Sequence, residues 1–138
     1  MPTTSVRWVT GKQFVGTDGN NHSIVLSGDN PHKGVSPSQM LLVALSACTA
    51  IDVLSIMEKK RKPLTMLEIF ADGEQDPHPP WAYKKIILTF RVSGHELNDK
   101  AIAQAIELSH DKFCSVAATI RGVADIETRF EIVDPQMP

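Results

Sequence analysis

The sequence predicts a mixed α+β fold built around one central helix. Three observations indicate this class: a nearly unbroken apolar run between Gly34 and Lys62, short stretches of alternating polar and apolar residues before and after it, and a second helical pattern from Asp99 to Lys112. Strands and helices in this order are typical of α+β proteins. With 138 residues, 42% of them hydrophobic, the chain is expected to form one domain over residues 1–138.

The central helix has a clear start and a clear end. Ser36 can serve as its N-cap, Pro37 fits the first helical position, and Gln39 completes a capping box. Pro63 must end it. From Met40 to Met57 apolar residues point in almost every direction, so we expect burial on all sides. A chain of this size supplies too little cover, and the pattern therefore predicts an extensive homodimer interface.

The polar residues within this helix form the first candidate site. Cys48, Asp52 and Ser55 follow the i, i+4, i+7 spacing that places side chains on one helix face. A thiol and a carboxylate on one face of an otherwise apolar helix suggest chemistry there.

Alternating segments predict antiparallel sheets around the helix. The expected strands are Ser5–Val9, Lys12–Thr17, His22–Leu26, Leu64–Ala71, Tyr83–Ser93 and Ala124–Val133. The first three read as a meander, and the fourth and fifth as partners. Asn98 can cap the second helix, from Asp99 to about Lys112, and a short helix is expected over Ser115–Arg121.

Composition excludes some classes of function. The net charge is -2, and the one basic cluster, at residues 59–62, falls at a helix C-terminus, so no nucleic-acid partner is expected. The N-terminus has no charged segment followed by an apolar one, which predicts a cytoplasmic protein without a secretory signal. Asp52 within the single long apolar segment argues for burial in protein and against a membrane span.

The two cysteines, Cys48 and Cys114, leave three alternatives: inert core, metal ligands or a redox pair. There is no CxxC or HxxxH pattern, the five histidines are scattered, and 66 positions separate the cysteines. We therefore expect no metal site.

Two passages carry a resemblance to a known family. SPSQMLLVALSACTAID, which contains Cys48, and AIELSHDKFCSVA, which contains Cys114, together resemble the OsmC/Ohr family of thiol-dependent peroxidases and their relatives. The likeness extends from near Val6 to Val133. It implies an OsmC-like fold in which two chains intertwine around central helices, with both cysteines close together at the subunit interface.

The resemblance also implies a mechanism. Cys48 would be the peroxidatic cysteine, which an organic hydroperoxide oxidises to a sulfenic acid, and Cys114 the resolving cysteine, which condenses with it to a disulfide. A dithiol would then reduce that disulfide. No metal or organic cofactor takes part.

The chain departs from the peroxidase pattern around the first cysteine. In the best-studied branches a glutamate follows the proline of the first motif and orients an N-terminal arginine. Here Ser38 stands at that position, followed by Gln39, and Arg7 or Lys12 is the candidate for the cation. The second motif usually reads Cys-Pro, whereas this chain has Cys114-Ser115. A sister branch of OsmC-like proteins resembles this sequence more closely than the peroxidase branches do.

The supporting residues have competing interpretations. A peroxidatic thiol needs a cation or donor to form its thiolate, and besides Arg7 and Lys12 the candidates are Arg121 and His110. Cys114, at a helix start, is expected to have a lowered pKa. Asp52 is expected to have a structural, hydrogen-bonded role. The alternative function is a non-peroxidatic relative that binds an apolar small molecule or senses redox state at the dimer interface.

Overall fold

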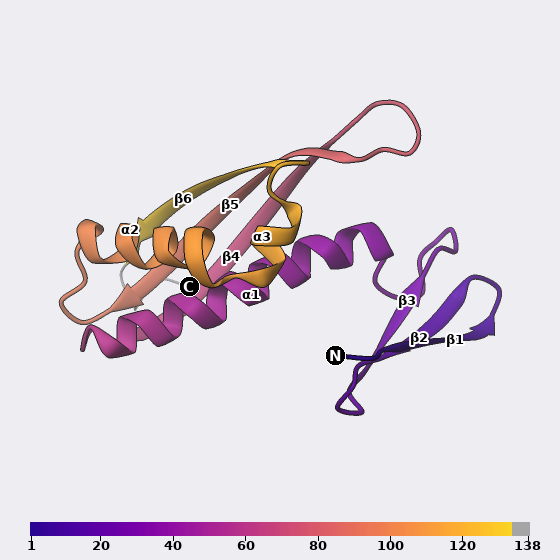
Figure 1. Ribbon diagram of the computed structural model, residues 1–138, viewed down its shortest axis with the longest axis horizontal. Coiled ribbons are helices and arrows are strands. Elements are labelled where there is room, and N and C mark those ends of the chain that lie inside the picture. Colours follow the sequence, from indigo (N-terminus) through magenta and orange to yellow (C-terminus); the bar gives the residue numbers. More distant parts are fainter. Residues whose placement is uncertain (134–138) are drawn as a thin grey trace. The chain divides into compact units, whose positions relative to one another are not determined.

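The computed structural model describes residues 1–133 of the chain (Figure 1). These residues group into two compact units, residues 1–41 and a larger unit that begins at Leu42. Helix α1 begins in the first unit and continues through the second. That the whole chain forms one domain stays a prediction.

The first unit is the predicted meander. Strands β1 (Ser5–Thr10), β2 (Gln13–Thr17) and β3 (Ser23–Ser27) form an antiparallel sheet in the order β1-β2-β3. Gly11 turns the first hairpin with a φ of 54°, and the Trp8 indole nitrogen donates to its carbonyl oxygen at 2.8 Å. The first hairpin of the predicted meander is therefore confirmed.

Helix α1 spans Pro37–Lys59, with Pro37 at the predicted first position. The predicted capping box is wrong in its side-chain part. Ser36 contributes its carbonyl oxygen, which accepts from the Met40 amide at 2.9 Å, but its buried hydroxyl has no hydrogen-bond partner. At the other end Arg61 takes a φ of 58° shortly before Pro63.

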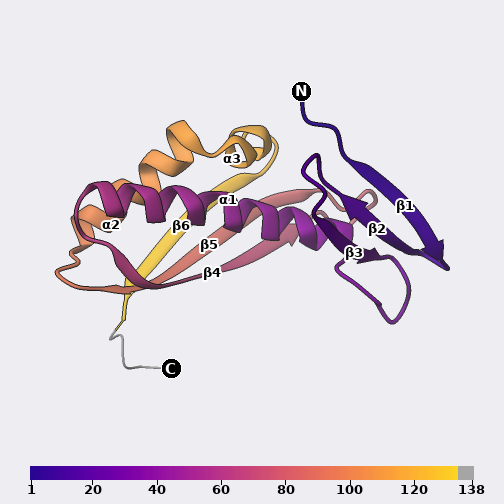
Figure 2. The ribbon, with the colours of Figure 1, turned by 90° about the horizontal axis from the view of Figure 1, so that it is seen from below.

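The second unit contains a three-stranded sheet with helices on one face (Figure 2). Strands β4 (Leu64–Gln75) and β5 (Tyr83–Gly94) pair antiparallel, as predicted. Strand β6 (Asp125–Ile132) pairs parallel with β5, so the expectation of antiparallel pairing holds for the other strands and fails for this one. The helices between β5 and β6 form the crossover that a parallel pair requires.

The crossover contains three helical segments. They are α2 (Asp99–Leu108), the π-helical turn η1 (Ser109–Phe113) and α3 (Ser115–Ile120). The Asn98 side chain caps α2 by accepting from the Ala101 amide at 2.8 Å, which confirms the predicted start. The predicted helix to Lys112 is regular only to Leu108, because its last residues widen into the π turn that leads to Cys114.

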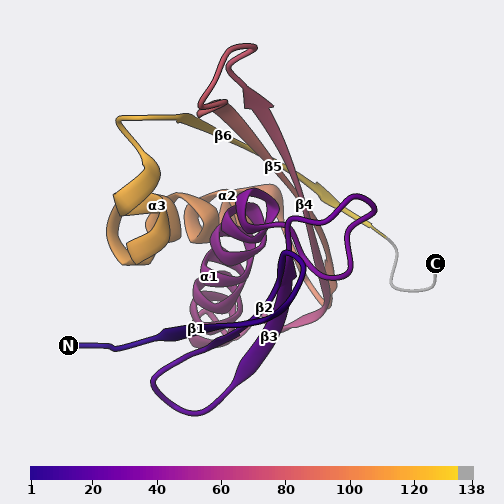
Figure 3. The ribbon, with the colours of Figure 1, turned by 90° about the vertical axis from the view of Figure 1, so that its right-hand side faces the viewer.

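The core of the second unit lies between this sheet and the helices (Figure 3). The apolar face of β5 is buried, and it packs with one ridge of α1 and with the inner face of α2. The residues concerned are Ile86, Leu88, Phe90 and Val92 on β5, Leu45, Val53 and Met57 on α1, and Ile102, Ala105 and Ile106 on α2.

Helix α1 is not buried on all sides within this chain. Val43 is 52% exposed and Ile51 65% exposed, while Leu45 and Val53 are fully buried. By length and composition α1 alone among the helices in residues 1–133 is long and apolar enough to cross a membrane, a weak signal that core helices share. The expected complete enclosure therefore requires something beyond the single chain.

Candidate functional site

The second unit brings the two cysteines together, although 66 positions separate them in the chain. Cys48 lies in the middle of α1, and Cys114 lies between η1 and α3. The sulfur atoms of Cys48 and Cys114 and a carboxylate oxygen of Asp52 all lie within 4.8 Å of one another. Both cysteines are free thiols; Cys48 is half-buried and Cys114 buried.

Helix geometry places Cys48 beside Asp52. The two residues are four positions apart on α1, so their side chains emerge one turn apart on the same face, as predicted. Both are half-buried, at the border between the buried ridge of α1 and its exposed side. The expected hydrogen-bonded role of Asp52 agrees with one contact: its Oδ2 accepts from the Ser109 hydroxyl at 2.8 Å.

Ser109 connects Asp52 with Cys114. It is fully buried and opens the π turn. Its hydroxyl donates to Asp52, and its carbonyl oxygen accepts from the Cys114 amide at 2.8 Å. Sequence reasoning missed this residue, although it stands in the quoted motif five positions before Cys114. The available signal was a small polar residue that continues the apolar face of α2, three positions after Ile106.

Cys114 is the N-cap of α3. Its sulfur accepts from the Ala117 amide at 3.3 Å, and its carbonyl oxygen accepts from the Ala118 amide at 3.0 Å. The backbone on both sides of Cys114 is thus held by hydrogen bonds, and the Ala117 amide is a fixed donor to the sulfur.

The pKa of Cys114 differs from the expectation. Burial, helped by the hydrogen bond and charge interaction with Cys48, raises the pKa of the Cys114 thiol to about 11. The Ala117 amide lowers it by less. The predicted lowering by the helix start is wrong because α3 has only six residues and Cys114 is only 2% exposed. Cys114 therefore keeps its proton at neutral pH.

The two candidate cations near Cys114, Arg121 and His110, are hydrogen-bonded to each other. Arg121 directs its Nη1 to the carbonyl oxygen of His110 at 3.0 Å and so ties the end of α3 to the π turn. This bond uses the main chain of His110. It supports the segment that carries Cys114.

The other four candidate supporting residues belong to the first unit and are placed only within it. Arg7 is an exposed residue of β1 opposite Val15, and Lys12 follows the hairpin turn. Ser38 and Gln39 occupy the first turn of α1. Their role beside Cys48 stays a prediction.

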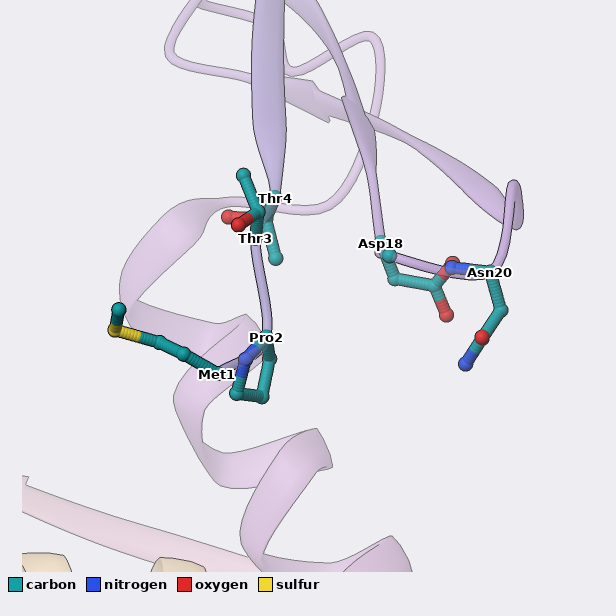
Figure 4. Close-up of a pocket in the computed structure, with 7 residues that line it drawn as sticks. Met1, Pro2, Thr3, Thr4, Asp18 and Asn20 are labelled. Atoms are coloured by element: carbon teal, nitrogen blue, oxygen red, sulfur yellow. The ribbon is translucent and has the colours of Figure 1, made fainter.

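An open hollow of about 660 Å³ lies at the N-terminus, outside this cluster. Figure 4 shows Asp18 and Asn20 on one side of it and Met1 to Thr4 on the other. The pKa of the Asp18 carboxyl is lowered by backbone hydrogen bonds from His22 and Asn20, which are the contacts of an ordinary turn. The thiol cluster is therefore the candidate site.

The structure is that of a small α+β protein in which a thiol on a long helix lies close to a second thiol at a helix N-terminus. The model of the family described as OsmC-like protein matches residues 28–129, and the chain belongs to this family. The resemblance stated from the two cysteine motifs is confirmed.

The chain is similar to one curated protein in sequence and to solved structures in fold. Protein YhfA of Escherichia coli strain K12 is 37% identical over 128 residues, 93% of this chain and 96% of that protein. The crystal structure of an OsmC-like protein from Mycoplasma pneumoniae has a TM-score of 0.85 at 17% identity, covering 97% of this chain and 98% of that one. The organic hydroperoxide resistance protein OhrB of Bacillus subtilis has a TM-score of 0.64 at 16% identity, covering 95% and 98%. These two structures share the fold with this chain.

Proposed function

We propose that this protein is a thiol peroxidase that reduces organic hydroperoxides through Cys48 and Cys114. The observation that carries the proposal is the approach of the two sulfur atoms to within 4.8 Å across α1 and α3. A disulfide bond measures about 2.05 Å, so at most about 3 Å of approach is needed. Fold similarity to a hydroperoxide resistance protein supports the proposal.

Burial and protonation support the assignment of the two roles. Cys114 is buried and protonated at neutral pH, which makes it a poor nucleophile. Cys48 is half-exposed on α1 and can be reached by a substrate. Cys48 therefore attacks first, and Cys114 resolves.

The chemistry balances in three steps. The Cys48 thiolate attacks one oxygen of the hydroperoxide, the O–O bond breaks, and the alcohol leaves with a proton while Cys48 becomes a sulfenic acid. The Cys114 sulfur then attacks the Cys48 sulfur, and water leaves as the disulfide forms. A dithiol reductant returns both thiols by exchange, which suits a reducing cytoplasm.

We propose that the protein acts as a homodimer. Val43, Ala47, Ile51 and Leu54 are exposed and fall within one quadrant of α1 by helix periodicity, and we call them the α1 stripe. Cys48 lies at the edge of this stripe. A second copy packed on it supplies the missing cover and an apolar wall beside the thiol for the organic group of the substrate.

The alternative function, a redox sensor without peroxidase turnover, is favoured by a different observation. A carboxylate oxygen of Asp52 lies within 4.8 Å of both sulfur atoms, whereas peroxidatic cysteines are activated by cations. A sensor needs only slow, reversible disulfide formation.

Hydroperoxide consumption with a dithiol donor separates the two functions. Wild type is expected to turn over cumene hydroperoxide, Cys48→Ser to lose turnover, and Cys114→Ser to be oxidised once to a sulfenic acid that dimedone traps. Thr119→Ala, on the exposed side of α3, is the matched control. Turnover that survives Cys48→Ser contradicts the peroxidase mechanism, and a disulfide that forms without turnover supports the sensor.

A further inference from the structure

We propose that Cys48, Cys114 and Asp52 form a binding site for a thiophilic divalent metal ion such as Zn²⁺. Their two sulfur atoms and one carboxylate oxygen lie within 4.8 Å of one another. The sequence led us to expect no metal site, because the ligands are not close in the chain. Two thiolates and one carboxylate suit zinc and disfavour Mg²⁺ and Ca²⁺, which take oxygen ligands.

The spacing of the three atoms suits a tetrahedral ion. With Zn–S bonds of about 2.3 Å and Zn–O bonds of about 2.0–2.2 Å, neighbouring ligand atoms lie roughly 3.5–3.8 Å apart. The cluster, at no more than 4.8 Å, needs at most about 1.3 Å of contraction. Side-chain rotation of the half-buried Cys48 and Asp52 supplies a movement of this size.

Hydrogen bonds outside the ligand set already orient two of the ligands. The Ser109 hydroxyl donates to Asp52 Oδ2 at 2.8 Å, which leaves the other carboxylate oxygen for a metal. The Ala117 amide donates to the Cys114 sulfur at 3.3 Å and would stabilise it as a thiolate. Such contacts are the usual supports of metal ligands.

Metal binding would replace the proton of the buried Cys114 thiol. A coordinated thiol is deprotonated outright, so the ion removes the cost of holding a thiolate there. Three protein ligands leave the fourth position of the ion for water or a small thiol, on the side of the half-exposed Cys48.

The bound ion and the disulfide exclude each other, because each uses both sulfur atoms. A metal ion would therefore protect the reduced thiols from hydroperoxide. This consequence rests on the proposed function, whereas the metal site itself rests only on the three side chains.

Cobalt binding to the full-length, reduced protein under anaerobic conditions tests the site. Co²⁺ bound by thiolates is expected to give sulfur-to-cobalt charge-transfer bands and intense tetrahedral d–d bands, at one ion per chain, and Zn²⁺ should displace it. Cys48→Ser and Cys114→Ser should each lose most of the charge-transfer intensity. Asp52→Asn should weaken binding at least about tenfold, and Ser109→Ala about 10–100-fold.

The control is Asp111→Asn, an exposed aspartate in the same π turn, which should bind cobalt as wild type does. Far-ultraviolet circular dichroism checks that each variant folds. Absence of thiolate bands in folded wild type, or wild-type affinity in Asp52→Asn, overturns the proposal. No hydroperoxide enters this assay, so the two proposals can fail separately. Cobalt bands without peroxidase turnover refute the proposed function alone. Peroxidase turnover without cobalt bands refutes the metal site alone.

Discussion

The hydrogen bond from Ser109 to Asp52 is expected to contribute strongly to stability, and Ser109→Ala tests this. The substitution removes a fully buried hydroxyl that lies 2.8 Å from the carboxylate. The hydrogen bond also joins the π turn to α1, because Ser109 and Asp52 are 57 positions apart in the chain. Alanine keeps the helical backbone but leaves that carboxylate oxygen without this donor.

The expected cost follows from the kind of hydrogen bond. A bond to a charged group contributes about 1.5–3 kcal/mol net, and the half-buried carboxylate recovers part of this from water, so we expect a loss of about 2 kcal/mol in the free energy of unfolding. For a chain of this size that corresponds to a fall of roughly 6–8 °C in melting temperature.

Urea denaturation followed by circular dichroism measures the loss. Thr119→Ala is the control, because its exposed hydroxyl also donates one hydrogen bond, to the Ser115 carbonyl at 2.8 Å, and should cost less than about 0.5 kcal/mol. Ser109→Ala combined with Asp52→Asn closes a double-mutant cycle, which should return a coupling of about 1 kcal/mol or more. Equal losses in Ser109→Ala and Thr119→Ala would refute the reasoning.

Two further predictions concern the α1 stripe and the resolving thiol. Ile51→Asp places a charge on the α1 stripe and should shift the dimer toward monomer in sedimentation velocity. Lys100→Asp, on the exposed side of α2, is the control and should leave the dimer unchanged. An unchanged dimer in Ile51→Asp would place the interface elsewhere. In Cys48→Ala the one remaining thiol should titrate, by thiolate ultraviolet absorbance, between 9.0 and about 11, because burial still raises the pKa of Cys114 while the contribution of Cys48 is lost. A midpoint below 9.0 would contradict the role of burial.

Local sequence patterns predicted most elements because their causes are local. Alternation identified the buried face of β5, and Asn98 marked the start of α2. Both signals depend on neighbours within a few residues. The parallel pairing of β6 could not be predicted in this way, because it depends on how the whole crossover packs on the sheet.

The candidate site was predictable in the part that lies on one helix. Cys48 and Asp52 share a face of α1 by periodicity alone. That Cys114 lies close to Cys48 was predicted only from the family resemblance. The role of Ser109 was predicted neither from periodicity nor from the resemblance. The pKa of Cys114 was predicted with the wrong sign, since a helix start is visible in sequence while burial is not.

By itself the sequence determined the α+β class, the long apolar helix and the thiol and carboxylate on one of its faces. Each of these features depends on residues spaced two to four positions apart. Only the tertiary structure decided that Cys114 joins them, that Ser109 holds Asp52, and that the second thiol keeps its proton. Those outcomes depend on desolvation and on contacts between residues far apart in the chain, and both arise only when the helices pack on the sheet.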